Sequence, residues 1–128
     1  GNDISRKSDP TPDEVAKRFR TLLEWIRQRD AKIPVFWIEV TPTNSRWHVW
    51  PRVEMATGLI NDVMSGDPQA HLIATAGSYL GVDGRPRREL FVDDQLHLNA
   101  EGYKQWATLI KATLHAQLGA AKSKAQKE

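Results

Sequence analysis

Residues 33–40 read Ile-Pro-Val-Phe-Trp-Ile-Glu-Val, and this stretch decides the fold class. It is a short, nearly continuous apolar run rich in β-branched and aromatic residues, which favours a strand covered on both faces, as in a parallel sheet. A second run of the same character, His-Leu-Ile-Ala-Thr, occupies residues 71–75. We therefore predict two short buried strands.

Three amphipathic helices are predicted around these strands. Thr11-Pro12-Asp13-Glu14 has the pattern of a capping box with proline in the first turn, and the helix that it opens ends near Asp30. A second helix is predicted from about Trp50 to Met64, and a third after Asn99, which can cap it. Their apolar residues recur every three or four positions, which predicts one core-facing stripe on each helix: Val15, Phe19, Leu22, Leu23 and Ile26; Val53, Ala56, Leu59, Ile60 and Val63; Tyr103, Trp106, Ala107, Ile110, Leu114 and Leu118.

The order of elements is typical of an α/β fold with a parallel sheet, because helices alternate with strands. Two parallel strands are few for such a sheet, since most sheets hold about four to six. We therefore expect the chain to be the C-terminal part of a doubly wound domain, with residues 1–118 in the domain and residues 119–128 as an unstructured Lys/Ala tail. Because the chain begins Gly1-Asn2-Asp3 without Met, we expect processing or truncation to have set its start.

Composition excludes several classes of function. The formal net charge is +2, and Lys and Arg are interspersed with Asp and Glu, so no nucleic-acid partner is predicted. The absence of cysteine excludes a thiolate nucleophile. No apolar run approaches the roughly 20 residues of a membrane span. No His/Asp/Glu cluster has metal-ligand spacing, so neither a metal nor another cofactor is expected. The localisation is left open.

Asp94 lies three residues before His97, just ahead of the last predicted helix. A neutral imidazole can take a proton from a serine hydroxyl when a carboxylate holds its other nitrogen in the required tautomer. Side chains at i and i+3 fall on one side of a turn, so one short segment can carry both groups. The pair therefore predicts acid–base catalysis. The alternative is a capping Asp beside a surface His, and Asp93 is the adjacent competitor.

The segment from Asp94 to Tyr103, Asp-Gln-Leu-His-Leu-Asn-Ala-Glu-Gly-Tyr, followed by Trp-Ala at 106–107, resembles the last signature block of the SGNH (GDSL-like) hydrolases. Residues 1–3, Gly-Asn-Asp, resemble the third block of that family. Residues 37–42 resemble its strand and proline turn, and residues 81–86 the loop before its final block. The resemblance covers about residues 1–118.

This resemblance implies a three-layer α/β/α, flavodoxin-like fold and a serine ester hydrolase that works through an acyl-serine intermediate. It implies that His97 is the general base and acid, that Asp94 holds its tautomer, and that the Asn2 amide helps to form the oxyanion hole. Its substrate would be a small-molecule ester: a short acyl ester, a lipid, a thioester or an acetylated sugar.

The chain departs from the family in one large respect. The Gly-Asp-Ser block that carries the nucleophile is absent, as is the second block with its oxyanion-hole glycine. None of the serines lies in a nucleophile motif: Ser5, Ser8, Ser45, Ser65, Ser78 and Ser123. We therefore expect the nucleophile to lie in the missing N-terminal part of the same domain, and the chain alone not to hydrolyse esters by this mechanism.

Two other functions remain open at this stage. One is a non-catalytic binding module that kept the fold, and the other is acyl transfer to an alcohol rather than to water. Trp25, Trp37 and Trp106 are expected to be packing residues. Trp47 and Trp50 flank His48 after the C-terminal end of a predicted strand, where open α/β sheets place ligands, so they are candidates for a substrate wall.

Overall fold

The computed structural model describes residues 4, 6 and 9–127. Within residues 9–127, three α-helices and two strands make up the fold, together with three short 3-10 helices labelled η. In chain order the elements are α1 (Pro12–Arg29), β1 (Val35–Ile38), η2 (Trp47–Val49), α2 (Trp50–Ser65), β2 (Ala70–Ile73), η3 (Ala76–Tyr79), η4 (Arg88–Leu90) and α3 (Ala100–Ala125). The predicted α/β class with two strands and three helices is confirmed.

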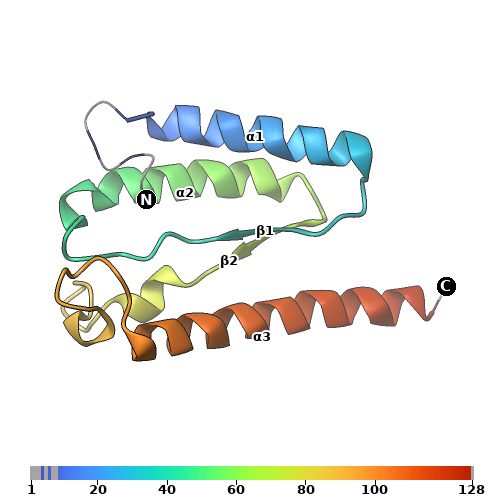
Figure 1. Cartoon of the computed structure of the whole chain (residues 1–128). Helices are drawn as coiled ribbons and strands as arrows, with labels where there is room; N and C mark the ends of the chain where they lie inside the picture. Colours follow the sequence, from blue (N-terminus) through green and yellow to red (C-terminus); the bar gives the residue numbers. More distant parts are fainter. Residues whose placement is uncertain (1–3, 5, 7–8, 128) are drawn as a thin grey trace.

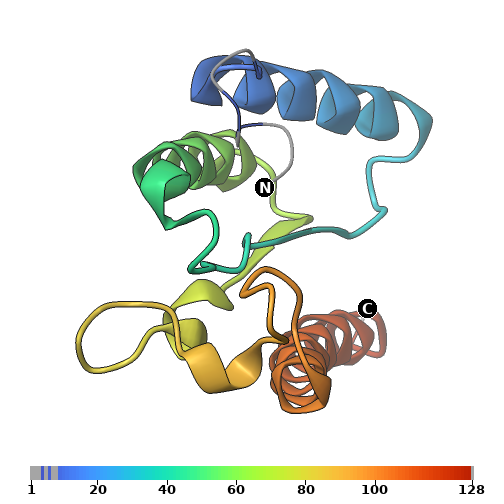
Figure 2. The same cartoon turned by 60° about the vertical axis from the view of Figure 1, so that its left-hand side comes forward.

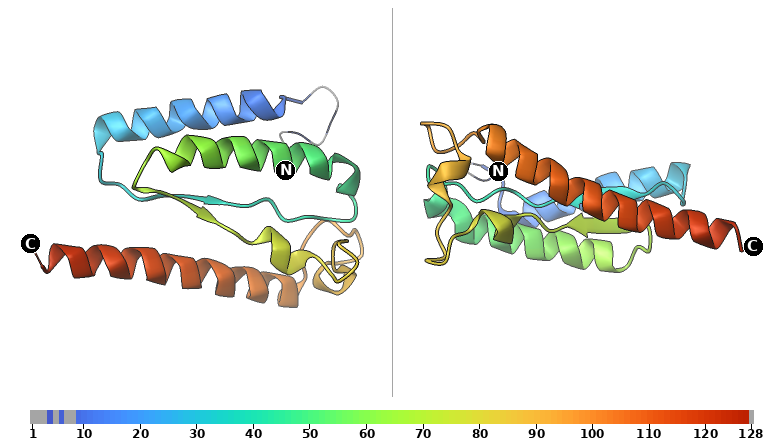
Figure 3. Two further views of the ribbon diagram at one scale, coloured as in Figure 1. Left: turned by 180° about the vertical axis from the view of Figure 1, so that it is seen from behind. Right: turned by 90° about the horizontal axis from the view of Figure 1, so that it is seen from below.

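The two strands form a parallel pair at the centre of the molecule, with Val35 opposite Ala70 and Ile38 opposite Ile73. Helices α1 and α2 lie on one side of this pair and α3 on the other, as Figures 1 and 3 show. The arrangement is the predicted three-layer α/β/α architecture.

Both strands are shorter than predicted, and β1 is only half-buried along its length. The Glu39 N–H still donates to the Ile73 carbonyl at 3.1 Å. Beyond it, the Glu39 side chain accepts the N–H groups of Thr75 and Ala76, both at 2.9 Å, in place of a main-chain acceptor. This side-chain contact ends the ladder of main-chain bonds at the carboxyl ends of the two strands.

The main core lies between α1, α2 and the sheet. Its buried residues are Ala16, Phe19, Leu23, Ile60 and Met64. The prediction that Leu22 faces the core was wrong, because 53% of this residue is exposed. Trp25, expected to be a packing residue, is half exposed and lies under the Arg29 guanidinium, 3.5 Å from its ring centroid.

The predicted helix starts are confirmed. The Thr11 hydroxyl accepts the Glu14 N–H at 3.3 Å, and the Glu14 carboxylate accepts the Thr11 N–H at 2.7 Å. At α3 the Asn99 side chain accepts the Gly102 N–H at 3.0 Å. Each cap satisfies a helix-end donor that has no partner within the helix.

The expectation of an unstructured tail from residue 119 differs from the structure, which continues α3 through Ala125. Ala and Lys are strong helix formers, and the single Gly119 does not outweigh them. The described side chains of residues 116–127 are exposed, so this part of α3 has no core to cover. In Figure 1 these turns extend beyond the sheet.

The loops that follow β1 and β2 gather at one end of the molecule, beside the first turns of α2 and α3 (Figure 2). In parallel α/β sheets this end, beyond the carboxyl ends of the strands, is where ligands bind. Among the described residues, no helix is long and apolar enough to cross a membrane.

Candidate active site

The segment 92–97 forms a closed loop between η4 and α3. At its base, Phe91 and Leu98 form an antiparallel bridge, and the Val92 N–H donates to the His97 carbonyl at 2.9 Å. Inside the loop, the Gln95 N–H donates to the Val92 carbonyl at 2.9 Å. The loop is therefore held by its own main-chain bonds.

Asp94 and His97 are in direct contact within this loop. The His97 Nδ1 lies 2.6 Å from the Asp94 Oδ2. The other carboxylate oxygen accepts the N–H groups of Leu96 at 2.8 Å and His97 at 2.9 Å. The carboxylate thus fixes both the main chain and the ring of His97. It makes Nδ1 the protonated nitrogen of a neutral ring and leaves Nε2 as the basic one.

The environment of this pair keeps Asp94 ionised. The bond to the His97 side chain, followed by those from the N–H groups of His97 and Leu96, lowers the pKa of Asp94 to about 2. The side chains of His97 and Asp94 are 68% and 47% exposed. An ionised carboxylate beside an open imidazole is the arrangement required to orient a general base.

Gln95, between the two members of the pair, was not singled out by sequence reasoning. Its φ of 53° lies in the left-handed region, which glutamine rarely adopts. Its side-chain amide donates to the carbonyls of Val92 at 3.2 Å and Arg88 at 3.3 Å. No local sequence signal announces this backbone conformation, because glycine, asparagine and aspartate are its usual carriers.

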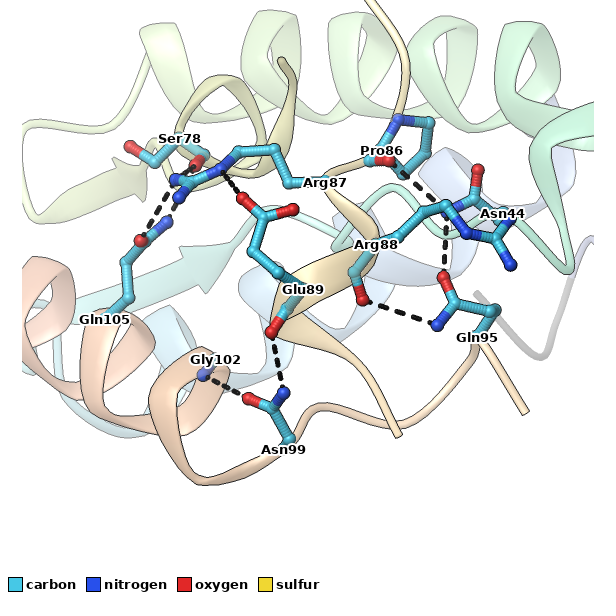
Figure 4. Close-up of polar contacts among 10 residues, drawn as sticks. All are labelled: Asn44, Ser78, Pro86, Arg87, Arg88, Glu89, Gln95, Asn99, Gly102 and Gln105. Carbon is cyan, nitrogen blue, oxygen red and sulfur yellow. Dashed lines mark hydrogen bonds and ion pairs between the residues drawn. The ribbon is translucent and has the colours of Figure 1, made fainter. Parts of the chain in front are cut away.

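Asn44 and Ser45, in the turn that follows β1, also contact this loop. The Asn44 side-chain N–H donates to the Gln95 Oε1 at 3.1 Å and to the Pro86 carbonyl at 3.3 Å (Figure 4). The Ser45 N–H donates to the Gln95 carbonyl at 3.2 Å, and its hydroxyl donates to the Asp94 carbonyl. Sequence reasoning did not single out Asn44, and it considered Ser45 only as a serine outside any nucleophile motif.

The start of α3 anchors the loop from its other side. The Asn99 amide donates to the Glu89 carbonyl at 2.7 Å, as Figure 4 shows, and the buried Tyr79 hydroxyl donates to the Gly102 carbonyl at 2.8 Å. A Cβ atom at Gly102 would lie 2.3 Å from the Leu90 carbonyl oxygen. Glycine is therefore required where α3 meets this segment.

A cavity of about 200 Å³ lies beside the loop. Leu96, the residue before His97, forms part of its wall, together with the end of β1 and the start of α2. Trp50 lines it and stacks on Trp47, with ring centroids 6.0 Å apart. Of the two tryptophans considered for a substrate wall, Trp50 thus borders a cavity to which the loop contributes Leu96. A larger cavity of about 590 Å³, between η4 and α3, is lined by no residue of the segment 92–97.

Two of the residues considered for the site remain, Asn2 and Asp93. Asn2 lies outside the described residues, so its place relative to His97 stays a prediction. Asp93, the competitor of Asp94, is exposed, and the contacts to His97 come from Asp94. The spacing therefore selects the carboxylate that the structure brings to the imidazole.

The model of the GDSL-like lipase/acylhydrolase family matches residues 1–105, which include both members of the pair and the loop that holds them. The chain belongs to this family. The family resemblance seen in the sequence is thereby confirmed. A search of curated proteins returned no match.

The fold of this GDSL-like chain is also similar to that of a solved protein from Streptococcus pneumonia described as a candidate platelet activating factor. The TM-score is 0.70 at 17% sequence identity, and the match covers 88% of this chain. It covers 55% of the other chain, so this chain spans about half the length of that neighbour. At this identity the likeness supports the SGNH-type fold alone.

Proposed function

We propose that the chain is the His/Asp-bearing part of a serine ester hydrolase that cleaves a carboxylic ester through an acyl-serine intermediate. The observation that carries this proposal is the 2.6 Å contact between the His97 Nδ1 and the Asp94 Oδ2 in an exposed loop. Membership of the GDSL-like lipase/acylhydrolase family supports hydrolase chemistry in general. The pair supplies the base and the orienter that such chemistry requires.

In this mechanism His97 transfers protons through Nε2. The Asp94 contact occupies Nδ1. Nε2 has no hydrogen-bond partner among the described residues, so it is the nitrogen left for proton transfer. The proton of the serine hydroxyl passes to Nε2 as the serine oxygen attacks the ester carbonyl, and it then passes to the departing alcohol. Water repeats the sequence on the acyl-serine and releases the acid. Asp94 stabilises the imidazolium that forms in each half.

We place the nucleophile of this mechanism outside these 128 residues. Among the described serines, the hydroxyls of Ser45, Ser65 and Ser123 donate to main-chain carbonyls. None is paired with His97 in the structure. The match covers 55% of the solved neighbour, which supports a serine supplied by a further part of such a domain. Asn2 is proposed as an oxyanion donor, a role whose loss costs about 3 kcal/mol of barrier.

The cavity beside Leu96 is the proposed site for part of the substrate. It is bounded mostly by aliphatic side chains and Trp50, which suits an apolar group, and Arg46 lies on its wall. Because Leu96 precedes His97, a group held there lies next to the catalytic loop. Substrate chemistry beyond a carboxylic ester is left open by these contacts.

Two polypeptides test this proposal: the 128-residue chain, and the same chain extended by the N-terminal part of the domain with its Gly-Asp-Ser strand. We expect the extended protein to hydrolyse p-nitrophenyl acetate, and His97→Ala to abolish this turnover. The matched control is His115→Ala, which alters an exposed histidine on α3. The short chain is expected to show no His97-dependent turnover.

The two polypeptides test separately where the nucleophile lies and whether His97 acts in ester hydrolysis. Turnover by the short chain that disappears on His97→Ala would show that the nucleophile lies within these residues. A folded extended protein whose ester turnover is the same in wild type and His97→Ala would overturn the hydrolase mechanism itself.

A further inference from the structure

The Asp94–His97 contact does not by itself place the imidazole relative to the sheet. All the bonds that Asp94 makes to Leu96 and His97 span two or three residues, so they would move with the loop as a unit. Both side chains are exposed, and packing therefore does little to hold them. The position of the pair must come from contacts that leave the loop.

Those contacts converge from the turn after β1 onto two consecutive residues. Asn44 binds the side chain of Gln95, and Ser45 binds the carbonyls of both Asp94 and Gln95. These bonds join residues about 50 positions apart in the chain, as the separations of 51 and 49 show. They tie the catalytic loop to the carboxyl end of β1, the end where ligands bind in parallel sheets.

Both the backbone and the side chain of Gln95 take part in these contacts. Its left-handed backbone aims two successive carbonyls, those of Asp94 and Gln95, at Ser45. Its side chain at the same time accepts from Asn44 and donates to the Arg88 carbonyl, as Figure 4 shows. It also donates to the Val92 carbonyl. The left-handed region is sterically unfavourable for a residue with a Cβ atom, and a non-glycine residue stays there only where surrounding contacts compensate.

We propose that Asn44, Ser45 and Gln95 form a clamp that positions the Asp94–His97 pair over the carboxyl end of β1. They are positioning residues, since they act through the loop and not on the substrate. The catalytic consequence rests on the proposed hydrolase function, whereas the structural consequence does not. Because Leu96 lines the cavity, the clamp also sets one wall of the proposed substrate site.

The first test reads the position of the loop directly and needs no catalysis. Nuclear Overhauser contacts are measured between the protons of residues 44–45 and those of residues 94–97. In the wild type these contacts are expected, because Asn44 and Ser45 bind Asp94 and Gln95. Gln95→Gly keeps the left-handed backbone and removes the side-chain bonds, and Ser45→Ala removes the bond to the Asp94 carbonyl. Each is expected to weaken the Overhauser contacts, whereas the Asp94–His97 contact, which lies within the loop, should remain.

Two further variants separate the clamp from general loss of structure. Ser45→Thr restores the hydroxyl and should return the wild-type spectrum. Ser65→Ala removes an equivalent hydroxyl bond, to the Asp62 carbonyl at the end of α2, and should leave the spectrum unchanged. Circular dichroism establishes that each variant is folded. Wild-type Overhauser contacts between residues 44–45 and 94–97 in folded Gln95→Gly and Ser45→Ala would overturn the clamp, whatever the outcome of the ester assay.

In the extended, active protein the same variants give a second, independent result. We expect Gln95→Gly and Ser45→Ala to lower kcat roughly 10- to 100-fold with KM nearly unchanged, because the base is misplaced while the substrate groups remain. Weakened Overhauser contacts together with an unchanged kcat would leave the clamp in place but overturn its catalytic role. Loss of all His97-dependent turnover from the wild type would instead overturn the proposed function.

Discussion

Two acid–base pairs in this molecule have the same length and opposite surroundings. The Arg27 Nε and the Asp67 Oδ2 are 2.6 Å apart, as are the His97 Nδ1 and the Asp94 Oδ2. The side chains of the first pair are 18% and 14% exposed, and those of the second 68% and 47%. Distance alone therefore does not distinguish a pair that joins two elements from a pair that is open to solvent.

The partners of each pair explain the difference. Arg27 is always charged, and it also donates to the Ile33 carbonyl at 2.7 Å, so it joins the end of α1 to the segment that enters β1. Asp67, after α2, also accepts the Gln69 N–H at 2.9 Å. His97, in contrast, carries an imidazole, the usual general acid and base of enzymes, and its Nε2 has no hydrogen-bond partner among the described residues. The first arrangement suits stability, and the second suits proton transfer.

The largest expected effect is on catalysis at the exposed pair. Asp94→Asn keeps an oxygen for the main-chain N–H groups but permits the wrong tautomer of His97. We expect kcat of the extended hydrolase to fall about 10⁴-fold, with an unchanged midpoint of urea unfolding. Asp93→Asn, which removes the neighbouring exposed charge, is the matched control and should stay near wild-type activity. Equal losses in the two variants would contradict the assignment of Asp94.

The next effect is on stability at the half-buried pair. Asp67→Ala leaves the Arg27 Nε and the Gln69 N–H without their acceptor, so the free energy of unfolding should fall by about 1–3 kcal/mol. Turnover per folded molecule should not change. Urea denaturation measures the first quantity, and Asp62→Ala, an exposed site on α2, should stay within about 0.5 kcal/mol of the wild type. A larger loss of unfolding free energy in Asp62→Ala than in Asp67→Ala would contradict the stabilising role of the Arg27–Asp67 pair.

The smallest effect appears in the acid range. Burial raises the pKa of Asp67, but the bonds from Arg27 and Gln69 outweigh it, and its pKa lies below the ordinary 3.8. The stability from a lowered pKa is complete above 3.8 and is lost as the pH falls through the folded-state value. Asp67→Asn should therefore flatten the loss of unfolding free energy below about pH 4.

Asp94 provides the comparison in the same titration. Because the pKa of Asp94 is about 2, the stability that its ionised form contributes is lost between pH 3.8 and about 2. Its contacts span at most three residues, however, and can partly persist in the unfolded chain. Asp94→Asn should therefore flatten the curve less than Asp67→Asn does. Urea denaturation at a series of pH values measures both. The reverse order would show that the exposed pair is the more important one for stability.

Features that depend on near neighbours were predictable from the sequence. The capping box of Thr11 and Glu14, the Asn99 cap and the Asp94–His97 pair all join residues three positions apart. At that separation the local chain geometry brings the side chains together whatever surrounds them. The alternation of strands and helices was predictable for a related reason, since hydrophobic periodicity reflects the local backbone repeat.

Features that depend on distant neighbours were decided by the tertiary structure. The sequence did not indicate that Asn44 and Ser45 would bind the loop at Gln95, or that Asp67 would meet Arg27, 40 positions away. It also did not show that Leu22 would face outward, because a stripe marks the apolar side of a helix but not the extent of its cover. Such contacts depend on the path of the chain between the partners, and that path is set by the packing of the helices on both sides of the sheet.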